Sequence, residues 1–383
     1  MGIGVYGFMK STLKILPAAA FLIFFAACSA PSGLQVGLNN GTNNNSNNGN
    51  NGNNNGNGGT PPVCGAQNTY LQTQTFLPGQ LSFHATGFLD GQFWEVNPAY
   101  PEGALTYGPY TGRVPLGFSL ATYTLTIDNN TSDTNKVLWV DVFDSSKNQT
   151  LAIHYIHRTD FTAVNTAQTF QLGFVNTGIC DLEARSIYTA QGGTIVHQKT
   201  TFFQPTTATP FTVTDGSLSA DFANSYLSTT PAFTFSAWFN TTQSGTILGY
   251  QDTDYPATPT AAWIPAIYVG TGGHLRVSLN LNAQAVSANV VNDGTWHYVA
   301  LVASISGQTV YLDGAAIGTV AGVVVPNLTY NQIGNGYTSG GWANLGGNGG
   351  WFPFVGQLGN IGLYSTAYTS QQIQADYLAN KPQ

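Results

Sequence analysis

Apolar and polar residues alternate in short runs along most of the chain beyond residue 70, and Gly, Asn and Asp separate the runs. Alternation with a period of two indicates half-buried β-strands, and no stretch of the first half keeps a helical period. Many short strands joined by tight turns predict an antiparallel β-sandwich. The predicted strands of this half are Thr75–Leu77, Leu81–Ala85, Ala121–Ile127, Val137–Phe143, Thr150–Ile156, Thr169–Val175, Cys180–Tyr188 and Thr194–Phe202.

The stretch Val291–Thr319 has the clearest hairpin pattern. Its first strand, which begins at Trp296, is apolar at both parities, so both faces are predicted to be covered. The residue pairs at 306–307 (Ser-Gly) and 313–314 (Asp-Gly) tolerate the backbone angles of tight turns. The pattern therefore predicts a hairpin in the middle of a second sandwich.

The segments of the second half occur in a characteristic order. They are Phe233–Phe239, Thr246–Tyr250, His274–Asn280, the hairpin, Gln332–Gly336 and Phe354–Tyr364, then a short helix over Tyr368–Leu378. Thr369 or Ser370 is the expected helix cap, with Ile373 and Tyr377 on one face. This order resembles laminin-G-like (concanavalin A-like) jelly-roll domains, although the family's usual acid in the last strand is Asn360 here. The resemblance implies a fold and a broad role, and it names no ligand.

Together the patterns predict an all-β protein with two antiparallel β-sandwich (jelly-roll) domains after a disordered linker. Residues 28–63 form the predicted tether, because their Asn- and Gly-rich composition offers almost nothing to bury. The first sandwich is placed at 64–203, a Thr/Pro/Ala linker at 204–210 and the laminin-G-like domain at 211–383. The strand pattern of the first sandwich is loosely similar to the galactose-binding-like jelly rolls of carbohydrate-binding modules.

The amino terminus has the features of an export signal. Lys10 and Lys14 precede a short apolar run, and the run ends in small residues before Cys28. This ending resembles a bacterial lipobox, which implies a signal peptide over 1–27 and lipidation of Cys28. Ser29 then favours the outer membrane or cell surface, reached through the lipid anchor alone. The alternative is an ordinary signal peptide with an incidental cysteine.

The charge of the chain limits the classes of partner, and its cysteine count predicts a disulfide. Only 7% of residues are charged and the net charge is −7, with no Lys/Arg cluster beyond the signal, so no nucleic-acid partner is expected. The chain has three cysteines. With Cys28 lipidated, Cys64 and Cys180 remain as an even pair in an oxidising compartment, which predicts one disulfide. Two free buried thiols are the alternative.

The acidic residues give little support to catalysis. The three Glu of the chain are Glu95, Glu102 and Glu183, all in the first half. Glu95 and Glu102 lie in an aromatic, proline-rich loop and could in principle support glycoside hydrolysis. A surface loop whose aromatics pack on themselves is the simpler interpretation. The second half has no Glu, so the two-Glu machinery of related glucanases is absent.

Aromatic residues on loops are the candidate ligand contacts. Trp94 and Tyr100 offer flat faces to sugar rings in the first half. In the second half a Gly/Asn-rich loop contains the other candidates, which are Tyr337, Trp342, Asn344 and Trp351. Packing on the domain's own rim is the alternative for each, favoured for Trp351 and even for Trp342.

A calcium site is the candidate cofactor site. Asp252 and Asp254 could place two hard oxygens on Ca²⁺, as laminin-G-like domains often do. A polar loop tip without metal is the alternative, since further acidic ligands are not evident.

These features favour a surface-anchored lipoprotein that binds glycans or another cell-surface ligand without catalysis, in the manner of an adhesin. A structural or protein–protein interaction component of the envelope or of a surface fibre is the alternative. A glycoside hydrolase that uses Glu95 and Glu102 is a third possibility.

Overall fold

The structure is a computed structural model that describes residues 70–81, 83–131, 135–191, 193–213, 220–223, 232–253, 255, 257–280, 283–304, 306–322, 328, 330–345 and 349–382. The predicted signal peptide and tether, together with Cys28, Cys64 and Asp254, lie outside these residues. Every described residue belongs to one compact unit, 59–383. Within the described ranges no helix is long and apolar enough to cross a membrane.

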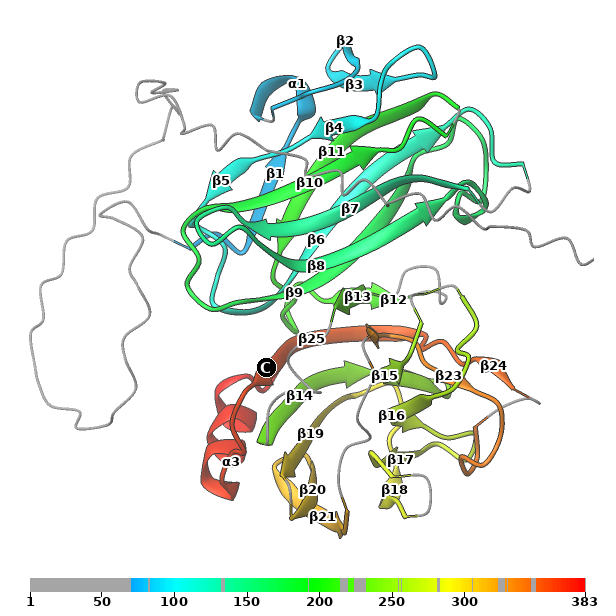
Figure 1. The fold of residues 1–383 in the computed structure, drawn as a ribbon. Helices are drawn as coiled ribbons and strands as arrows, with labels where there is room; N and C mark the ends of the chain where they lie inside the picture. The colour runs from blue at the N-terminus through cyan, green and yellow to red at the C-terminus, as the bar shows by residue number, and fades with distance from the viewer. Residues whose placement is uncertain are drawn as a thin grey trace, which may run out of the picture. The chain divides into compact units, whose positions relative to one another are not determined.

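The first half is a sandwich of two antiparallel sheets (Figure 1). The first sheet has the order β9 (Gln168–Asn176), β6 (Gly117–Ile127), β11 (Ile195–Phe203), β3 (Phe93–Val96) and β2 (Phe88–Asp90), with β1 (Thr73–Phe76) also on β11. The second sheet has the order β4 (Gly103–Thr106), β10 (Leu182–Tyr188), β7 (Lys136–Asp144) and β8 (Gln149–His157), with β5 (Pro109–Thr111) on β10. Alternate residues of β6 and β7, such as Leu125 and Val140, are fully buried between the sheets.

The second half continues the first sheet and adds another. The continuation has the order β18 (Ala285–Val290), β17 (His274–Val277), β16 (Trp263–Val269), β15 (Gly245–Gln251), β22 (Tyr330–Ile333) and β13 (Ala220–Ala223), and β13 pairs in parallel with β9. The other has the order β12 (Phe211–Val213), β25 (Gly356–Tyr364), β14 (Ala232–Asn240), β19 (Trp296–Ser304), β20 (Gly307–Leu312) and β21 (Ala315–Val320). A separate two-stranded sheet joins β23 (Tyr337–Thr338) to β24 (Gly350–Trp351). The all-β prediction is confirmed.

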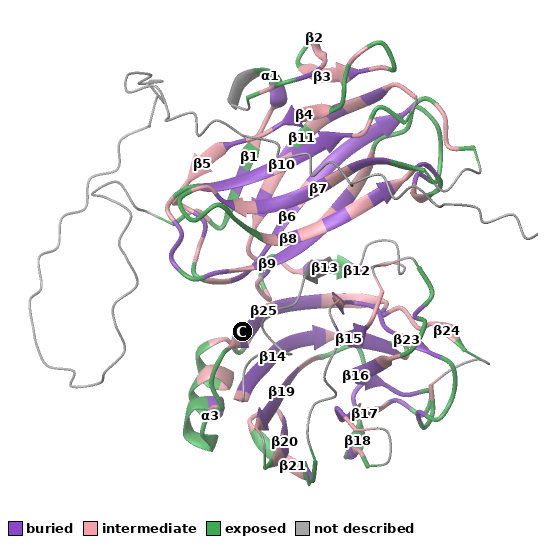
Figure 2. Ribbon diagram, viewed as in Figure 1, coloured by how far each residue is buried: buried purple, intermediate pink, exposed green. Residues whose placement is uncertain are grey.

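The predicted hairpin is β19 and β20, and both of its faces are covered as expected. Val299 and Leu301 lie in the main core of this half, while Tyr298 and Ala300 lie in a second apolar cluster on the other face. Most of β14 and β19 is accordingly buried (Figure 2). The turn after β20 has positive φ angles at both central residues, Asp313 and the following glycine, as a tight hairpin turn requires.

The predicted C-terminal helix is α3 (Ser370–Ala379), and it covers this second cluster. Thr369 is its cap, because the Thr369 side chain accepts a hydrogen bond from the backbone N–H of Gln372. Ile373 is fully buried, and the Tyr377 ring stacks on Trp238 with centroids 5.4 Å apart. The cap and the apolar face of the helix are confirmed.

One predicted strand is wrong. The stretch Leu81–Ala85 begins at the end of a short helix, α1 (Pro78–Leu81), and contains only an isolated bridge from Phe83 to Tyr107. The proline and glycine that open α1 favour a turn over an extended strand.

The linker 204–210 is ordered by hydrogen bonds. The backbone N–H of Thr206 donates to the carbonyl of Thr209, which closes a turn. Asn360 in β25 accepts from the backbone N–H of Thr207, and its own backbone N–H donates to the carbonyl of Pro205. Asn360 also has φ 45°, a region that Asn tolerates better than most residues. Asn360, which stands where the family usually has an acid, therefore has a local structural role in holding the linker.

Candidate functional site

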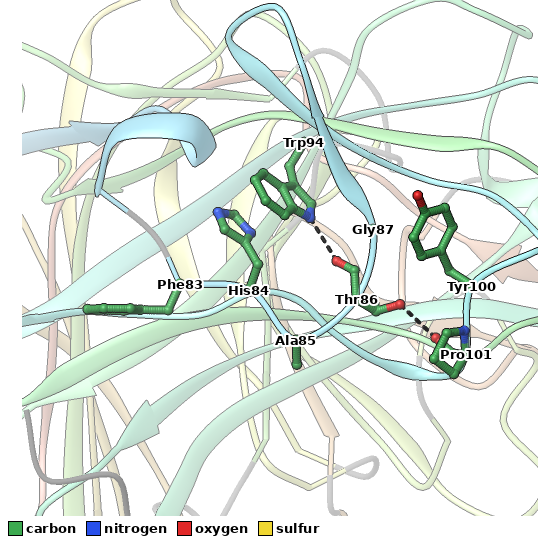
Figure 3. Close-up of a pocket in the computed structure, with 8 residues that line it drawn as sticks. All are labelled: Phe83, His84, Ala85, Thr86, Gly87, Trp94, Tyr100 and Pro101. Atoms are coloured by element: carbon green, nitrogen blue, oxygen red, sulfur yellow. Dashed lines mark hydrogen bonds between the residues drawn. The ribbon is translucent and has the colours of Figure 1, made fainter.

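A pocket of about 480 Å³ opens on the first half of the protein. Figure 3 shows its lining, which comes from the 83–87 segment, from β3 and from the loop after β3. The lining residues are Phe83, His84, Ala85, Thr86, Gly87, Trp94, Tyr100 and Pro101. The pocket therefore contains both ligand-contact candidates of this half, Trp94 and Tyr100.

Trp94 is held in one orientation. Its indole stacks on the His84 imidazole with ring centroids 3.4 Å apart and planes 7° from parallel. Its Nε1–H donates to the carbonyl of Thr86 at 2.7 Å (Figure 3). A stacked ring with its polar edge satisfied has little freedom to rotate, so Trp94 is a rigid, half-buried apolar platform.

The His84 ring is itself fixed by two backbone carbonyls. Nδ1 lies 2.7 Å from the Leu105 oxygen and Nε2 lies 2.9 Å from the Pro78 oxygen. Burial lowers the pKa of His84 below 6.5, although both carbonyls act to raise it. A carbonyl oxygen only accepts, so a neutral imidazole, with one N–H, can donate to only one of these two oxygens, and the protonated ring can donate to both. In either state His84 presents a flat ring on which the indole stacks.

The far wall of the pocket is formed by Tyr100 and the chain around it. The Tyr100 ring stacks on Phe88 with centroids 5.7 Å apart. The Thr86 hydroxyl donates to the Pro101 carbonyl at 2.8 Å, which ties the two rims together (Figure 3). Gly87 lies between them with φ +86°, and a Cβ there would clash with the Glu95 carbonyl oxygen. Only glycine allows this close approach.

More aromatic surface adjoins the pocket. Phe83, which is 44% exposed, contacts Tyr107 and Tyr110 at centroid distances of 5.5 and 5.7 Å. Leu89 on β2 is 51% exposed. The pocket is therefore one part of a wider aromatic and apolar surface.

The two acids proposed for hydrolysis do not line the pocket. Glu95 is half-buried on β3, while Glu102 is exposed in the loop before β4. Burial and the nearby carboxylates of Asp90 and Asp128 raise the pKa of Glu95. Of the eight lining residues, all of them described, none carries a carboxylate.

Two of the candidates in the second half contact each other. Tyr337 and Trp351 are register partners in the β23–β24 ladder, and their rings meet edge to face with centroids 5.4 Å apart. Tyr255 contacts Trp351, and Trp263 contacts Tyr337, in the same geometry. These four half-buried rings, Tyr255, Trp263, Tyr337 and Trp351, are called the end cluster below.

Trp342 and Asn344 lie apart from the end cluster. Trp342 is 7% exposed and belongs to the main core of the second half, which corresponds to the packing alternative for this residue. Asn344 is exposed, with φ 56°, and its carbonyl accepts from the backbone N–H of Thr271. The structure thus brings Tyr337 and Trp351 together and places Trp342 in the core.

Asp252 closes the loop between β15 and β16. Its carboxylate accepts hydrogen bonds from the backbone N–H groups of Thr260, Ala261 and Ala262 and from the Thr260 hydroxyl. Within the described residues no group of three His, Cys, Asp or Glu side chains is placed to hold a metal ion. Asp254 lies outside the described residues, so calcium binding by this pair stays a prediction.

Sequence reasoning missed His84, Gly87, Tyr255 and Trp263. His84 lies between Phe83 and Ala85, and nothing local indicates that it stacks on Trp94, ten positions later. The Thr-Gly pair before Phe88 was the one local indication that the backbone comes close to another segment at Gly87.

Residues 214–374 match a laminin G family model described as the concanavalin A-like lectin/glucanases superfamily. The second half of the chain is a concanavalin A-like jelly-roll domain. The match confirms the resemblance seen in the order of its segments. No curated protein matches the chain.

Three of the solved structures that match part of the chain are a sialidase, a pentraxin and a neurotoxin binding domain. The Trypanosoma rangeli sialidase in complex with sialic acid is 15% identical, with a TM-score of 0.33, over 44% of this chain and 27% of the sialidase. The SAP-like pentraxin from Limulus polyphemus is 20% identical, with a TM-score of 0.27, over 39% of this chain and 72% of the pentraxin. The binding domain of botulinum neurotoxin DC in complex with SialylT is 10% identical, with a TM-score of 0.28, over 43% of this chain and 39% of the neurotoxin domain. The chain thus spans about a quarter of the sialidase.

Proposed function

We propose that this protein is a non-catalytic, surface-anchored lipoprotein that binds a glycan at the Trp94 pocket. The observation that carries the proposal is the rigid indole. Sugar rings present C–H groups that pack on an aromatic face, and a face held by stacking and a hydrogen bond loses little entropy on binding. Trp94 has both restraints, and Tyr100 stands across the same pocket.

The composition of the pocket supports binding rather than hydrolysis. Retaining and inverting glycosidases place two carboxyl groups across the scissile bond. The pocket lining has none, and its histidine is committed to two backbone carbonyls. Glu95 and Glu102 lie outside the lining.

The test is a glycan array with the purified full-length chain in detergent. Wild-type protein is expected to bind a limited set of glycans, and Trp94→Ala is expected to lose them at least tenfold. Circular dichroism of the variant controls for folding, and Trp139→Ala serves as a matched change of a half-buried Trp that lies outside the pocket. Silence of the wild type across the array would contradict the proposal, as would equal binding by Trp94→Ala.

A protein partner is the second candidate, and the exposure of Phe83 and Leu89 favours it. Phe83 lines the pocket and Leu89 is the ladder partner of Trp94, and exposed large apolar side chains are common in protein interfaces. Silence across sugars, together with a cell-surface protein that binds wild type and not Phe83→Ser, would favour this candidate.

The anchoring part of the proposal comes from the sequence. Lipidation at Cys28 is expected to place the protein in the outer membrane or on the cell surface. Labelled palmitate should enter the wild-type protein in a bacterial host and should not enter Cys28→Ser. Equal labelling of both would remove the anchor from the proposal.

A further inference from the structure

His84 lies where α1, β3 and β4 meet. The backbone on either side of it is fixed to β4 and to the residue after β4. The N–H of Phe83 donates to the carbonyl of Tyr107, and the N–H of Ala85 donates to that of Ala104, both at 2.8 Å. The place of His84 in the fold is therefore set by its neighbours, and its side chain is the part that can respond to a change of charge.

The two ring nitrogens of His84 both face oxygen acceptors. Nδ1 lies 2.7 Å from the carbonyl oxygen of Leu105, in β4, and Nε2 lies 2.9 Å from that of Pro78, in α1. A neutral imidazole has one N–H, so its other nitrogen turns a lone pair toward a carbonyl oxygen, which repels it. The imidazolium has an N–H on each nitrogen. Two short contacts to carbonyl oxygens are therefore the geometry of the protonated ring.

The third neighbour of the ring is the indole of Trp94 (Figure 3). The ring centroids are 3.4 Å apart and the planes are 7° from parallel. An aromatic face attracts a cation, and Trp attracts it more strongly than Tyr or Phe does. The polar edge of the indole is held by its hydrogen bond to Thr86, so the stack on His84 is the second of its two restraints. The position of Trp94 therefore depends on that of His84.

No carboxylate lines the pocket to hold the proton on His84. Of the elements around the ring, α1 and β4 have no ionisable side chain. The ionisable groups on β2, β3 and β11 are Asp90, Glu95, His197 and Lys199, and the phenol of Tyr100 lines the same pocket. Burial lowers the pKa of His84 below 6.5 against the effect of the two carbonyls. The ring is therefore expected to gain its second N–H as the pH falls below 6.5.

We propose that His84 is the positioning residue of the Trp94 pocket and acts in its protonated form. The imidazolium donates to both carbonyls and keeps the indole stacked, whereas the neutral ring loses one of the two bonds and frees the indole to move. The pocket is therefore better ordered in mild acid than at neutral pH. Tighter binding of a ligand by the ordered pocket rests on the proposed function, and the coupling between His84 and Trp94 does not.

The coupling is tested without a ligand, by NMR of the full-length chain in detergent. Titration from pH 7.5 to pH 4 follows the histidine rings, and ¹⁵N relaxation gives the order parameter of each indole N–H. The order parameter of Trp94 is expected to rise with the midpoint of the His84 ring, and to be independent of pH in His84→Gln. His274→Gln, which changes a half-buried histidine of β17, should behave as wild type does.

Three results would overturn the proposal. They are a constant order parameter at Trp94 while His84 titrates, a pH-dependent order parameter that persists in His84→Gln, and a His84 ring that keeps one charge over the whole range. If His84→Gln does not fold, the wild-type titration decides alone. The contact between the two stacked rings assigns their signals through the nuclear Overhauser effect. The indole of Trp238, which is 2% exposed, is the reference that should not change.

Calorimetry tests the binding of a ligand at one pH unit above and one below the His84 midpoint, with a glycan that binds on the array. Wild type is expected to bind at least threefold more tightly at the lower pH, and His84→Gln equally at both. Equal affinities in wild type would overturn the effect of the proton on binding. A chain that binds no glycan at either pH contradicts the proposed function of the pocket, while the order parameter of Trp94 still decides the role of His84.

Discussion

Trp94 and His197 are register partners in the ladder between β3 and β11, so the indole of the pocket lies directly opposite a histidine that is 0% exposed. His197 Nδ1 lies 2.9 Å from the Thr106 hydroxyl and 3.0 Å from the Ser186 hydroxyl, and Nε2 lies 3.0 Å from that of Thr200. The pocket therefore rests on a buried polar network that is satisfied by hydroxyl groups, which can donate or accept.

The first prediction concerns His197 and pH. Burial lowers the pKa of His197 from 6.5 to about 3, and the neighbouring His84 acts in the same direction. Between these pH values the unfolded chain binds the proton that the folded chain excludes. Stability is therefore complete above pH 6.5 and falls as the pH drops toward 3, by up to ~1.4 kcal/mol per pH unit from this residue.

Urea unfolding at several pH values measures this slope. His197→Gln keeps a polar side chain but does not titrate, so the variant should show a shallower slope over the same range. A slope equal to that of wild type would show that His197 is not the group responsible.

The second prediction concerns Gly87, where φ is +86° and a Cβ would clash with the Glu95 backbone. Gly87→Ala should destabilise the protein by at least ~2 kcal/mol, from steric overlap added to the strain of positive φ. Gly91→Ala is the matched control, because Gly91 has φ +62° with nothing near its Cβ position, and should cost only about 1 kcal/mol. Equal losses of stability in the two variants, measured by thermal unfolding, would mean that the close approach of the backbone at Gly87 is unimportant.

Local pattern was enough to predict the elements in which burial alternates or a cap is visible. The hairpin at β19 and β20 and the Thr369 cap follow from neighbouring residues, so they were predictable. The candidate sites were harder to predict, because they depend on contacts between segments that are distant in sequence. Nothing near Gln251 in the sequence indicates that it pairs with Trp263 on the next strand.

Trp342 shows how local composition can mislead. A Trp within a Gly/Asn-rich run has the composition of an exposed loop, yet its side chain packs into the core. The Tyr268 hydroxyl donates to the Ala343 carbonyl at 2.7 Å, and the N–H of Thr271 donates to the Asn344 carbonyl at 2.8 Å. These two bonds, from segments some 70 residues away in sequence, fold the loop back on the domain.

The third prediction concerns the attachment of α3. Asp376 accepts hydrogen bonds from the Tyr298 hydroxyl at 2.6 Å and from the Ser236 hydroxyl at 3.1 Å, and both donor residues are 0% exposed. Asp376→Ala removes the carboxylate acceptor of two buried hydroxyls and should cost at least ~2 kcal/mol. Gln371→Ala, at an exposed position of the same helix, should change stability by less than ~0.5 kcal/mol. Chemical denaturation compares the two, and equal effects would contradict this role of Asp376.

The fourth prediction concerns His297, whose contribution to stability depends on pH in the direction opposite to that of His197. Its Nδ1 lies 2.9 Å from an Asp313 oxygen, and its Nε2 lies 3.3 Å from one of Asp293. The hydrogen bond that the His297 ring donates to Asp313 is the largest cause that raises the pKa of His297 above 6.5. The stabilisation from His297 is therefore complete below pH 6.5 and is lost as the pH rises through the folded-state value.

NMR titration of the His297 ring measures that value directly. Asp313→Asn keeps a residue that tolerates the φ of 51° at this turn and should move the pKa back toward 6.5. An unchanged titration curve in the variant would assign the shift to another cause.

The last prediction concerns Asp252 and the loop that carries Tyr255. Burial acts to raise the pKa of Asp252, but the hydrogen bonds from Ala261, Thr260 and Ala262 outweigh it, and the net shift is downward. Asp252→Ala removes the acceptor of four hydrogen bonds, so the loop 252–262 should be cleaved faster by protease while global stability falls by only about 1 kcal/mol. Asp252→Asn is the matched variant, because its amide oxygen can still accept and should retain part of the protection. Titration with Ca²⁺ on the same proteins separates the two roles: calcium heat that is present in wild type and absent in Asp252→Ala would establish a metal site, whereas identical traces would leave Asp252 as the residue that closes the loop.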